Sequence, residues 1–416
     1  MSRIRIRNFG PVREGLFEND GWIDIKKTTV FIGDQGSGKS TIAKLISTFS
    51  WIEKALTKGD HDIKHFTSHN RFRKNYCGYH KIDKYFFNLD KNDCAEIDYE
   101  GDSFEIIYRF GKLGIKQSSN KKYLLPQIMY VPAERNFIST IKKIKLLQLF
   151  SGSLVEFMAE FDNAKNAIKG GLQIPINEAT VEYDKLNDIV NIKGKDYKVQ
   201  LPETSSGFQS AVPLFMVSWY LANKINKNEN SMNEGMSADE LKRFKQGVQE
   251  IWANSNFTDE QIRAALSVLS SKFNSSAFIN IVEEPEQNLF PGSQRQILNS
   301  LLGFVNMNKG NQLILTTHSP YLINYLTLAV KANTVYNKIN SNLKNKELLS
   351  KINKIVPQNS IIKSNDLTIY ELDDSGKISK LKKYEGLPSD ENYLNKKLEE
   401  DNELFVNLLE IEDKCQ

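Results

Sequence analysis

The stretch Gly33-Asp34-Gln35-Gly36-Ser37-Gly38-Lys39-Ser40-Thr41 lies between an apolar run, Thr29–Ile32, and a segment, Ser40–Trp51, with apolar residues at every third or fourth position. The run is typical of a buried strand, and the spacing after it is typical of a helix. A strand, a glycine-rich loop ending in Lys and Ser, and a helix together form the context of a phosphate-binding loop. We therefore predict an α/β fold with a phosphate site at this loop.

Each part of the loop has a predicted task. Its glycines let backbone N–H groups turn toward phosphate oxygens, and the N-terminus of the helix adds its dipole. Lys39 should reach the β- and γ-phosphates of a nucleotide, and the Ser40 hydroxyl should ligate Mg²⁺. A glycine-rich turn arising by chance is the alternative, and the flanking strand and helix disfavour it. The predicted binding residues are Gly33, Gln35, Gly36, Ser37, Gly38, Lys39, Ser40 and Thr41.

A second apolar run, Ala277–Val282, ends in two adjacent acids, Glu283 and Glu284. Carboxylates at the C-terminal ends of parallel strands lie in the crevice where α/β proteins bind ligands. We predict that Glu283 holds Mg²⁺, directly or through water, and that Glu284 orients or deprotonates an attacking water. Without the phosphate loop, an acidic turn with no chemistry would be a serious alternative.

Two further polar turns adjoin apolar segments. His318 follows the run Gln312–Leu315, where a neutral imidazole can hydrogen-bond a γ-phosphate or a water. The turn Ser206-Gly207-Phe208-Gln209 directly precedes an apolar helix, Ser210–Ile225, whose N-terminus is a second possible anion site. Taken alone, a structural histidine and a simple helix cap would be the better explanations.

Together and in this order, the four motifs resemble those of the ATP-binding-cassette (ABC) ATPases, and more specifically the branch of RecF, SMC-type proteins and OLD ATPases. The resemblance implies an α/β P-loop ABC-ATPase head with a mixed β-sheet, an antiparallel β lobe and helical insertions. It implies ATP and Mg²⁺ as cofactors, and ATP hydrolysis as the activity. The implied assignments are Gly33–Thr41 as Walker A, Ser206, Gly207 and Gln209 as the signature motif, Glu283 and Glu284 as the Walker B acid and catalytic base, Asn288 and Leu289 as part of the D-loop, and His318 as the switch histidine.

In the resembling family the signature turn reaches the nucleotide of a second copy. The resemblance therefore implies a head-to-tail homodimer, with two ATP molecules held between Ser40 of one chain and Ser206 of the other. A γ-phosphate needs stabilisation on its far side for efficient cleavage, which a phosphate loop alone does not supply.

Three features depart from the common pattern of the family. The strand Gln127–Val131 leads into Pro132-Ala133-Glu134-Arg135 rather than into a glutamine loop, so Glu134 or Arg135 must serve there or the loop works differently. Phe208 stands where a second glycine is common. The insert 52–204 is too short for the long coiled coil of a chromosome-structuring ATPase.

The Pro-Ala-Glu-Arg sequence and the length of the chain resemble the ATPase subunits of two-gene bacterial antiphage systems, such as PtuA and AriA. We predict a sensor or scaffold subunit that controls a separate effector protein, a toxin or nuclease, because Asp373-Asp374 fits a turn better than a nuclease acid pair. A helical insert at 237–272 is a candidate docking surface. The alternative is a RecF-like ATPase that binds DNA in repair or end processing. A transporter ATPase is disfavoured by the insert lengths and the missing glutamine loop.

Composition sets further limits. Apolar residues make up 40% and charged residues 25% of the 416 positions, as is ordinary for a globular protein. The net charge is only +4, and the lysine-rich stretch Lys331–Lys363 and the cluster Lys142, Lys143 and Lys145 are either solvated surface or a nucleic-acid footprint. Three scattered cysteines, no signal-peptide pattern and no apolar run long enough for a bilayer favour a reducing, cytoplasmic location without a membrane partner.

Four segments are expected along the chain: an N-terminal part of the head (1–136), a part with a helical insert, hairpins and the signature helix (137–225), a helical insertion after the polar linker Asn226–Gly235 (226–275), and a C-terminal part of the head with a tail (276–416). His61, His65 and His69 recur every fourth residue and would share a face of a helix. A zinc site there is the minor alternative to an ordinary exposed helix.

Overall fold

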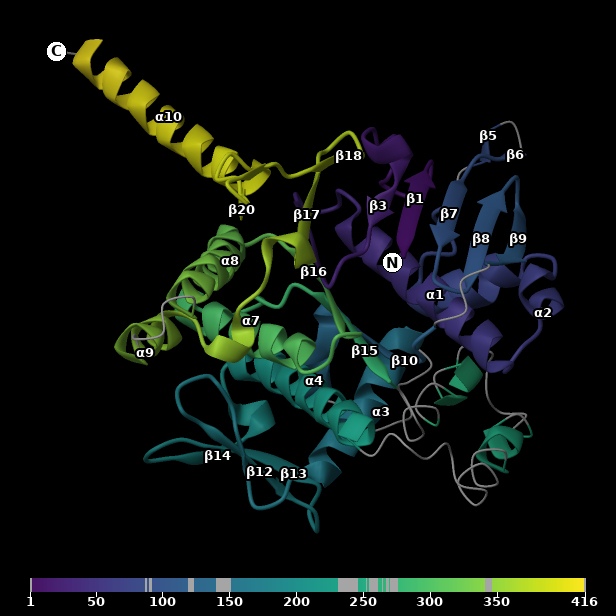
Figure 1. The fold of residues 1–416 in the computed structure, drawn as a ribbon, viewed down its shortest axis with the longest axis horizontal. Helices are drawn as coiled ribbons and strands as arrows, with labels where there is room; N and C mark the ends of the chain where they lie inside the picture. Colours follow the sequence, from purple (N-terminus) through teal and green to yellow (C-terminus); the bar gives the residue numbers. More distant parts are fainter. Residues whose placement is uncertain are drawn as a thin grey trace.

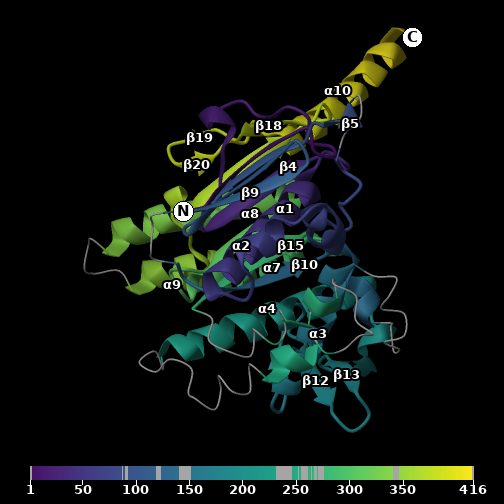
Figure 2. The same ribbon diagram turned by 90° about the vertical axis from the view of Figure 1, so that its right-hand side faces the viewer.

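The computed structural model describes residues 2–86, 88–89, 92–118, 123–139, 151–230, 246–251, 253, 261–263, 265–266, 269, 276–340 and 346–414. A central sheet runs through the body, with helices on both of its faces and a long C-terminal helix standing away from it (Figures 1 and 2). None of the described helices is long and apolar enough to cross a bilayer.

The central sheet has seven strands and mixed direction. In the order of the sheet, the first five strands are parallel to one another, the sixth is antiparallel to the fifth, and the seventh is parallel to the sixth. The parallel strands are buried on both faces, which explains their nearly continuous apolar sequences. The order is β10 (Pro126–Val131), β15 (Ala277–Glu283), β16 (Gln312–Thr317), β4 (Thr28–Gly33), β17 (Leu367–Leu372), β18 (Lys377–Lys380) and β2 (Gly15–Leu16).

Alternation along the strands divides the interior into two cores. On β4, Phe31 joins the core beneath α1 (Lys39–Lys58), whereas Val30 and Ile32 join the core on the other face. Successive side chains of a strand point to opposite faces, so one strand supplies both cores. The second core is covered by α3 (Gly152–Ala167), α4 (Ser206–Asn230), α7 (Pro291–Asn306) and α8 (Pro320–Asn340).

Two antiparallel sheets complete the architecture. One is the predicted β lobe, ordered β3 (Ile23–Asp24), β1 (Arg3–Arg7), β7 (Glu96–Glu100), β8 (Phe104–Arg109) and β9 (Lys112–Gln117). The other contains β11 (Leu172–Gln173), β12 (Thr180–Asp184), β13 (Ile189–Lys193) and β14 (Lys198–Gln200). The predicted fold class, an α/β P-loop head with a mixed sheet, an antiparallel lobe and added helices, is confirmed.

Local turns and caps set the boundaries of further elements. The segment 96–117 holds three strands, because the left-handed residues Phe110 and Gly111 allow a second tight turn. Helix α3 begins at Gly152, where the Ser151 side chain accepts from Leu154 N at 3.3 Å. Residues 133–139 form a 3₁₀ helix, and 140–150 lie outside the described residues.

The linker expected at Asn226–Gly235 is wrong in its first half. Helix α4 continues to Asn230, since none of the polar residues after Ile225 breaks a helix, and residues 231–245 lie outside the described part. The two helix starts expected at Ser237 and Thr258 also fall outside it, although 246–251 and 261–263 are helical. The shorter elements are α2 (Ile63–Thr67), the π-helix Phe72–Cys77, α9 (Lys346–Ile355), and the hairpins β5 (Asn88–Leu89) with β6 (Asn92–Asp93) and β19 (Lys383–Tyr384) with β20 (Leu387–Pro388). The long C-terminal helix is α10 (Tyr393–Lys414).

Candidate nucleotide site

The loop Gly33–Thr41 joins β4 to α1, as the sequence predicts. Gly33, Gly36 and Gly38 all have positive φ, at 144°, 78° and 106°. A Cβ on Gly33 would lie 2.2 Å from Leu372 O, and one on Gly38 would lie 2.9 Å from a methyl carbon of Val12. Backbone conformation therefore favours glycine at all three positions, and the close approach of neighbouring strands and loops also requires it at Gly33 and Gly38.

Lys39 lies inside this loop. Its ammonium donates to Gly33 O at 2.8 Å and to Asp34 O at 2.6 Å, and the residue is only 4% exposed. Burial lowers the pKa of Lys39 to about 8, although the nearby acids, Glu284 first, act in the opposite direction. Ser40, in the first turn of α1, is half-buried, and Gln35 and Gly36 are exposed.

Glu283 closes β15 and is held firmly by the end of β10. One carboxylate oxygen accepts the hydroxyl of Tyr130, and the other accepts Ala133 N at 3.0 Å. Lys44 Nζ lies 4.0 Å from Oε1. A carboxylate oxygen has more than one lone pair, so Glu283 retains acceptor capacity, and the Ser40 hydroxyl is a second oxygen donor. Hard oxygen donors of this kind fit Mg²⁺, and these two residues would hold it.

Glu284 turns away from the strand in a left-handed conformation, with φ of 43°. Its Oε1 lies 3.3 Å from His318 Nε2, and both side chains are about one-third exposed, at 33% and 28%. The hydrogen bond from His318 is the main cause that lowers the pKa of Glu284. The structure thus brings together Lys39, Glu284 and His318, which the sequence placed far apart.

Two residues that sequence reasoning did not assign position this group. The Glu286 carboxylate accepts the Thr317 hydroxyl and His318 N, each at 2.7 Å, and so fixes the end of β16 relative to the acids. Burial raises the pKa of Glu286. Its only signal in the sequence was its place two residues after Glu284.

The second such residue is Arg135, which is 0% exposed. Its guanidinium donates to Glu283 O at 2.7 Å, to Glu284 O at 2.6 Å and to Ser210 O at 3.2 Å. Burial lowers the pKa of Arg135 to about 10, which leaves the group charged at neutral pH. Of the two residues considered in place of the usual glutamine, Arg135 is buried and hydrogen-bonds the backbone of the acidic loop that begins at Glu283, whereas Glu134 is exposed.

The signature turn packs on the acidic loop of its own chain. Ser210 Oγ lies 3.2 Å from Gln287 Oε1, and a Cβ on Gly207 would lie 2.9 Å from Asn288 O. Gln209 Nε2 donates to Pro202 O at 2.9 Å and Thr204 O at 2.8 Å, which holds the turn in shape. Ser206 itself is exposed, and none of the hydrogen bonds of Lys39 within the described residues involves this turn.

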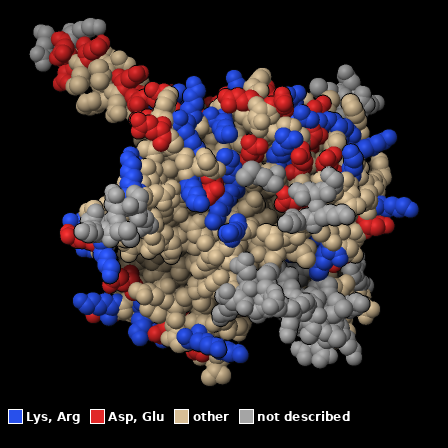
Figure 3. All heavy atoms as spheres, viewed as in Figure 1, with Lys and Arg blue, Asp and Glu red and all other residues tan. Residues whose placement is uncertain are grey.

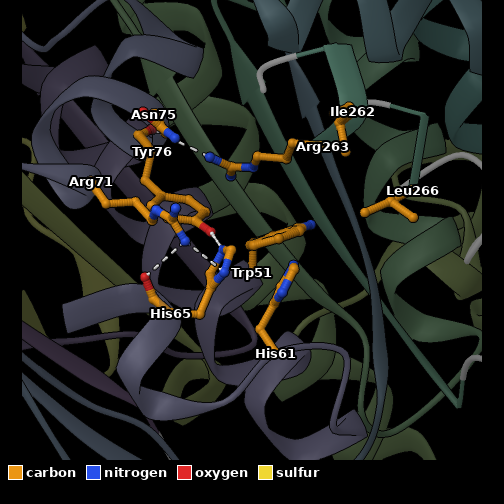
Figure 4. Close-up of a pocket in the computed structure, with 9 residues that line it drawn as sticks. All are labelled: Trp51, His61, His65, Arg71, Asn75, Tyr76, Ile262, Arg263 and Leu266. Carbon is orange, nitrogen blue, oxygen red and sulfur yellow. Dashed lines mark hydrogen bonds between the residues drawn. The ribbon is translucent and has the colours of Figure 1, made fainter. Parts of the chain in front are cut away.

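The histidine triplet does not share a helix face. Helix α2 spans only Ile63–Thr67, so His61 and His69 lie outside it. His65 hydrogen-bonds Tyr76 Oη at 2.9 Å and Arg71 Nη1 at 2.7 Å through its two ring nitrogens. Figure 4 shows His61 and His65 beside a cavity of about 70 Å³ that two arginines, Arg71 and Arg263, also line. Among the described residues no group of three potential metal ligands lies together. The expectation that the three histidines share one face of a helix is wrong.

The other candidate regions are placed as follows. Asp373 Oδ1 accepts from Ser375 N and Lys377 N, both at 3.0 Å, so the acid pair there belongs to a turn, as predicted. The described lysines of 331–363 are exposed on and after α8 and α9, and basic residues are scattered over the face in Figure 3. Lys363 lines a cavity with Lys27, which precedes β4, so it lies at the opposite end of that strand from the phosphate loop. Lys142, Lys143 and Lys145 lie outside the described residues.

Comparisons with known proteins agree with this class of fold. A family model described as an AAA ATPase domain matches residues 246–323, a stretch that contains β15, β16 and His318. No curated protein matches the sequence. The SMC head domain from Thermotoga maritima is 12% identical with a TM-score of 0.31, over 78% of this chain and 90% of that chain. A nucleotide-free ATP-binding cassette from an ABC transporter is 12% identical with a TM-score of 0.30, over 93% of both chains.

A third similar structure is an Smc head domain with an extended coiled coil, bound to the C-terminal domain of ScpA from Pyrococcus furiosus. It is 11% identical with a TM-score of 0.31, over 78% of this chain and 92% of that chain. At these identities and TM-scores, the similarity supports no residue role and no activity for this chain. The strand order, the phosphate loop after β4 and the acids after β15 define an α/β P-loop protein with the fold of an ABC-type ATPase head. The chain has this fold, and its residues 246–323 match the model of an ATPase domain.

The position of Arg135 generates a prediction. Arg135→Lys keeps the charge but cannot bridge Ser210 O and Glu284 O together, so Glu284 should lose its exact placement. We expect kcat for ATP to fall about tenfold to a hundredfold while KM changes little, because small misplacements of a catalytic group are costly. Steady-state kinetics measures both constants, and circular dichroism checks the fold. A folded variant with unchanged kcat, or one with raised KM and unchanged kcat, contradicts the positioning role.

Proposed function

We propose that the chain is an ATP hydrolase whose complete catalytic site forms between two copies of the protein. The observation that carries the proposal is the division of the site. Lys39, Glu284 and His318 lie together, whereas the signature turn at Ser206 is exposed and packs on the D-loop residue Asn288 instead. A second copy, related by a two-fold axis, supplies the turn to the far side of the γ-phosphate.

The residues divide the work as follows. The phosphate loop and Lys39 bind the phosphates, and Ser40 and Glu283 would hold Mg²⁺, which would neutralise part of the phosphate charge. Glu284, whose pKa is lowered by the hydrogen bond from His318, accepts a proton from water as the water oxygen attacks the γ-phosphorus. The bond from that phosphorus to the bridging oxygen breaks, and ADP leaves with the electron pair. His318 holds Glu284 in place. The helix dipole at Ser206 and the N–H of Gly207 of the second copy stabilise the γ-phosphate.

We further propose that this ATP-dependent dimer is the sensor or scaffold subunit of a bacterial antiphage system, acting in the cytoplasm on a separate effector protein. The support is the resemblance of Pro132–Arg135 and the whole motif set to such subunits, together with the turn at Asp373, which leaves that acid pair structural. The four segments expected along the chain are kept as the proposed domain organisation, with the helical insert at 237–272 as the effector's docking region.

The dimer is tested with Glu284→Gln. The variant keeps the size of the side chain but cannot accept the proton, so it should bind ATP and remain in the closed dimer. Analytical ultracentrifugation with Mg²⁺-ATP should show a dimer, and without nucleotide a smaller species. Glu284→Gln combined with Lys39→Ala is the control and should not respond to ATP. An unchanged mass upon addition of ATP to Glu284→Gln rules out the ATP-sandwiched dimer.

The buried lysine predicts a pH dependence of ATP binding. Lys39 has a pKa of about 8 in the free protein, and bound phosphates favour its charged form, so binding above pH 8 must take up a proton. The affinity should therefore be nearly flat below about pH 7, fall about fivefold from pH 8 to pH 9, and approach a tenfold fall for each further pH unit. Calorimetric titration of Glu284→Gln measures this. Lys39→Arg, always protonated, should bind with a flatter profile over this range. An equal slope in both proteins contradicts the assignment.

The defence role is tested in cells challenged with phage. The chain expressed with its neighbouring genes should protect them, and Lys39→Ala, which cannot hold the phosphates, should abolish protection at equal protein level. Protection that is unaffected by Lys39→Ala contradicts the proposal. The RecF-like alternative makes a different prediction: the purified chain should bind duplex DNA with an affinity that falls steeply with salt.

A further inference from the structure

Helix α10 leaves a large apolar surface exposed. It stands away from the body in both ribbon views (Figures 1 and 2). Between Leu404 and Ile411 six large apolar side chains are each 45% to 63% exposed: Leu404, Phe405, Val406, Leu408, Leu409 and Ile411. A surface of this kind, concentrated on one projecting element, marks an interaction site rather than ordinary scattered exposure.

The root of the helix is fixed beside the phosphate loop. Tyr393 Oη donates to Asp34 Oδ2 at 2.7 Å, and Tyr393 N donates to Glu371 Oε1 at 2.7 Å. Leu394 is buried in the core under the sheet. From this anchor the 22 residues of α10 extend for roughly 33 Å, at about 1.5 Å per residue. The exposed side chains therefore lie well beyond the edge of the sheet that carries the nucleotide site.

The apolar residues of α10 are not arranged as a narrow seam. At about 100° per residue, positions 404 to 411 place apolar side chains over roughly 220° of the circumference. A two-stranded coiled coil needs a much narrower stripe. The tip of α10 is therefore suited to contact with a folded surface on more than one side. A single partner helix would leave much of the apolar surface exposed to solvent.

The charge of α10 indicates what that surface is. The helix carries seven acidic residues against three lysines, a net charge of −4, whereas the whole chain has a net charge of +4, so the rest of the chain has a net charge of +8 (+4 minus −4). Two copies of the acidic helix on their own would repel each other, and the basic body of another copy would attract either. A second copy is also the body that the proposed dimer brings to the phosphate loop, next to the root at Asp34.

We propose that α10 is an arm that packs across the body of the second copy when ATP closes the dimer. The inference rests on the proposed ATP-sandwiched dimer and adds a second interface to it. The arm extends the contact beyond the two nucleotides, and its root on Asp34 places it at the loop that ATP occupies.

The test compares two substitutions one turn or less apart on the arm, each in the Glu284→Gln protein. Phe405→Asp puts a charge in the apolar arc, and Asn407→Asp adds the same charge outside it. Both positions are exposed in the structure described here, so neither change should disturb the fold of one copy. With Mg²⁺-ATP, sedimentation equilibrium should show that Phe405→Asp raises the dimer dissociation constant about tenfold or more, which corresponds to about 1.4 kcal/mol, and that Asn407→Asp changes it less than about twofold.

A photo-crosslinking residue at position 405 gives an independent readout. It should yield covalent dimers only with ATP, joined to the body of the second copy, and position 407 should yield few. Dimers that form with an unchanged dissociation constant in Phe405→Asp overturn the arm while leaving the ATP dimer intact, as expected if α10 serves a different protein. Absence of any ATP-dependent dimer in Glu284→Gln overturns both proposals.

Discussion

The parallel pairing of β4 with β16 and β17 determines where the chemistry takes place. In this register Ile32 lies opposite Thr317, and Gly33 lies opposite Leu372, so the residue before the phosphate loop is level with the residue before His318. The next pairing aligns Glu283 with Thr316. Because side chains alternate along a strand, a shift of one residue in either ladder would turn Glu283 or Thr316 to the opposite face. The geometry of the site therefore depends on the hydrogen-bond register of these strands as well as on the identity of its residues.

Much of this arrangement could be predicted from sequence. The apolar runs before Gly33, Glu283 and His318 predict buried parallel strands, and such strands end at one edge, so the proximity of their polar ends follows. The role of Arg135 could not be predicted, because its partners are backbone carbonyls, which leave no trace in a sequence. Likewise, the polar residues 226–230 carry no helix breaker, and composition alone does not distinguish the end of a helix from its exposed continuation.

For the histidines, the sequence pattern predicted a shared helix face that the structure does not contain. Recurrence at every fourth position indicates a shared face only if one helix runs through all three residues. Here Asp62 caps a helix that ends at Thr67, and the rings of His61 and His65 stack with centroids 3.9 Å apart. His61 stacks on His65, and the two ring nitrogens of His65 hydrogen-bond Tyr76 and Arg71. The Asp62 cap, which starts the helix at Ile63, indicates the course of the backbone better than the spacing of the histidines does.

The placement of β4 also bears on how the chain folds during synthesis. Among the described strands, β4 pairs with β16 and β17, which begin 284 and 339 residues after it in the chain (312 − 28 and 367 − 28). The antiparallel lobe and α1 can associate early, but the strand that carries the phosphate loop stays unpaired at both edges until the last quarter of the chain has been made. Such non-local pairing carries a large loop-closure entropy and folds slowly. An unpaired apolar strand is also an aggregation risk, so the nascent protein depends on shielding, by its own lobe or by chaperones, until synthesis nears completion.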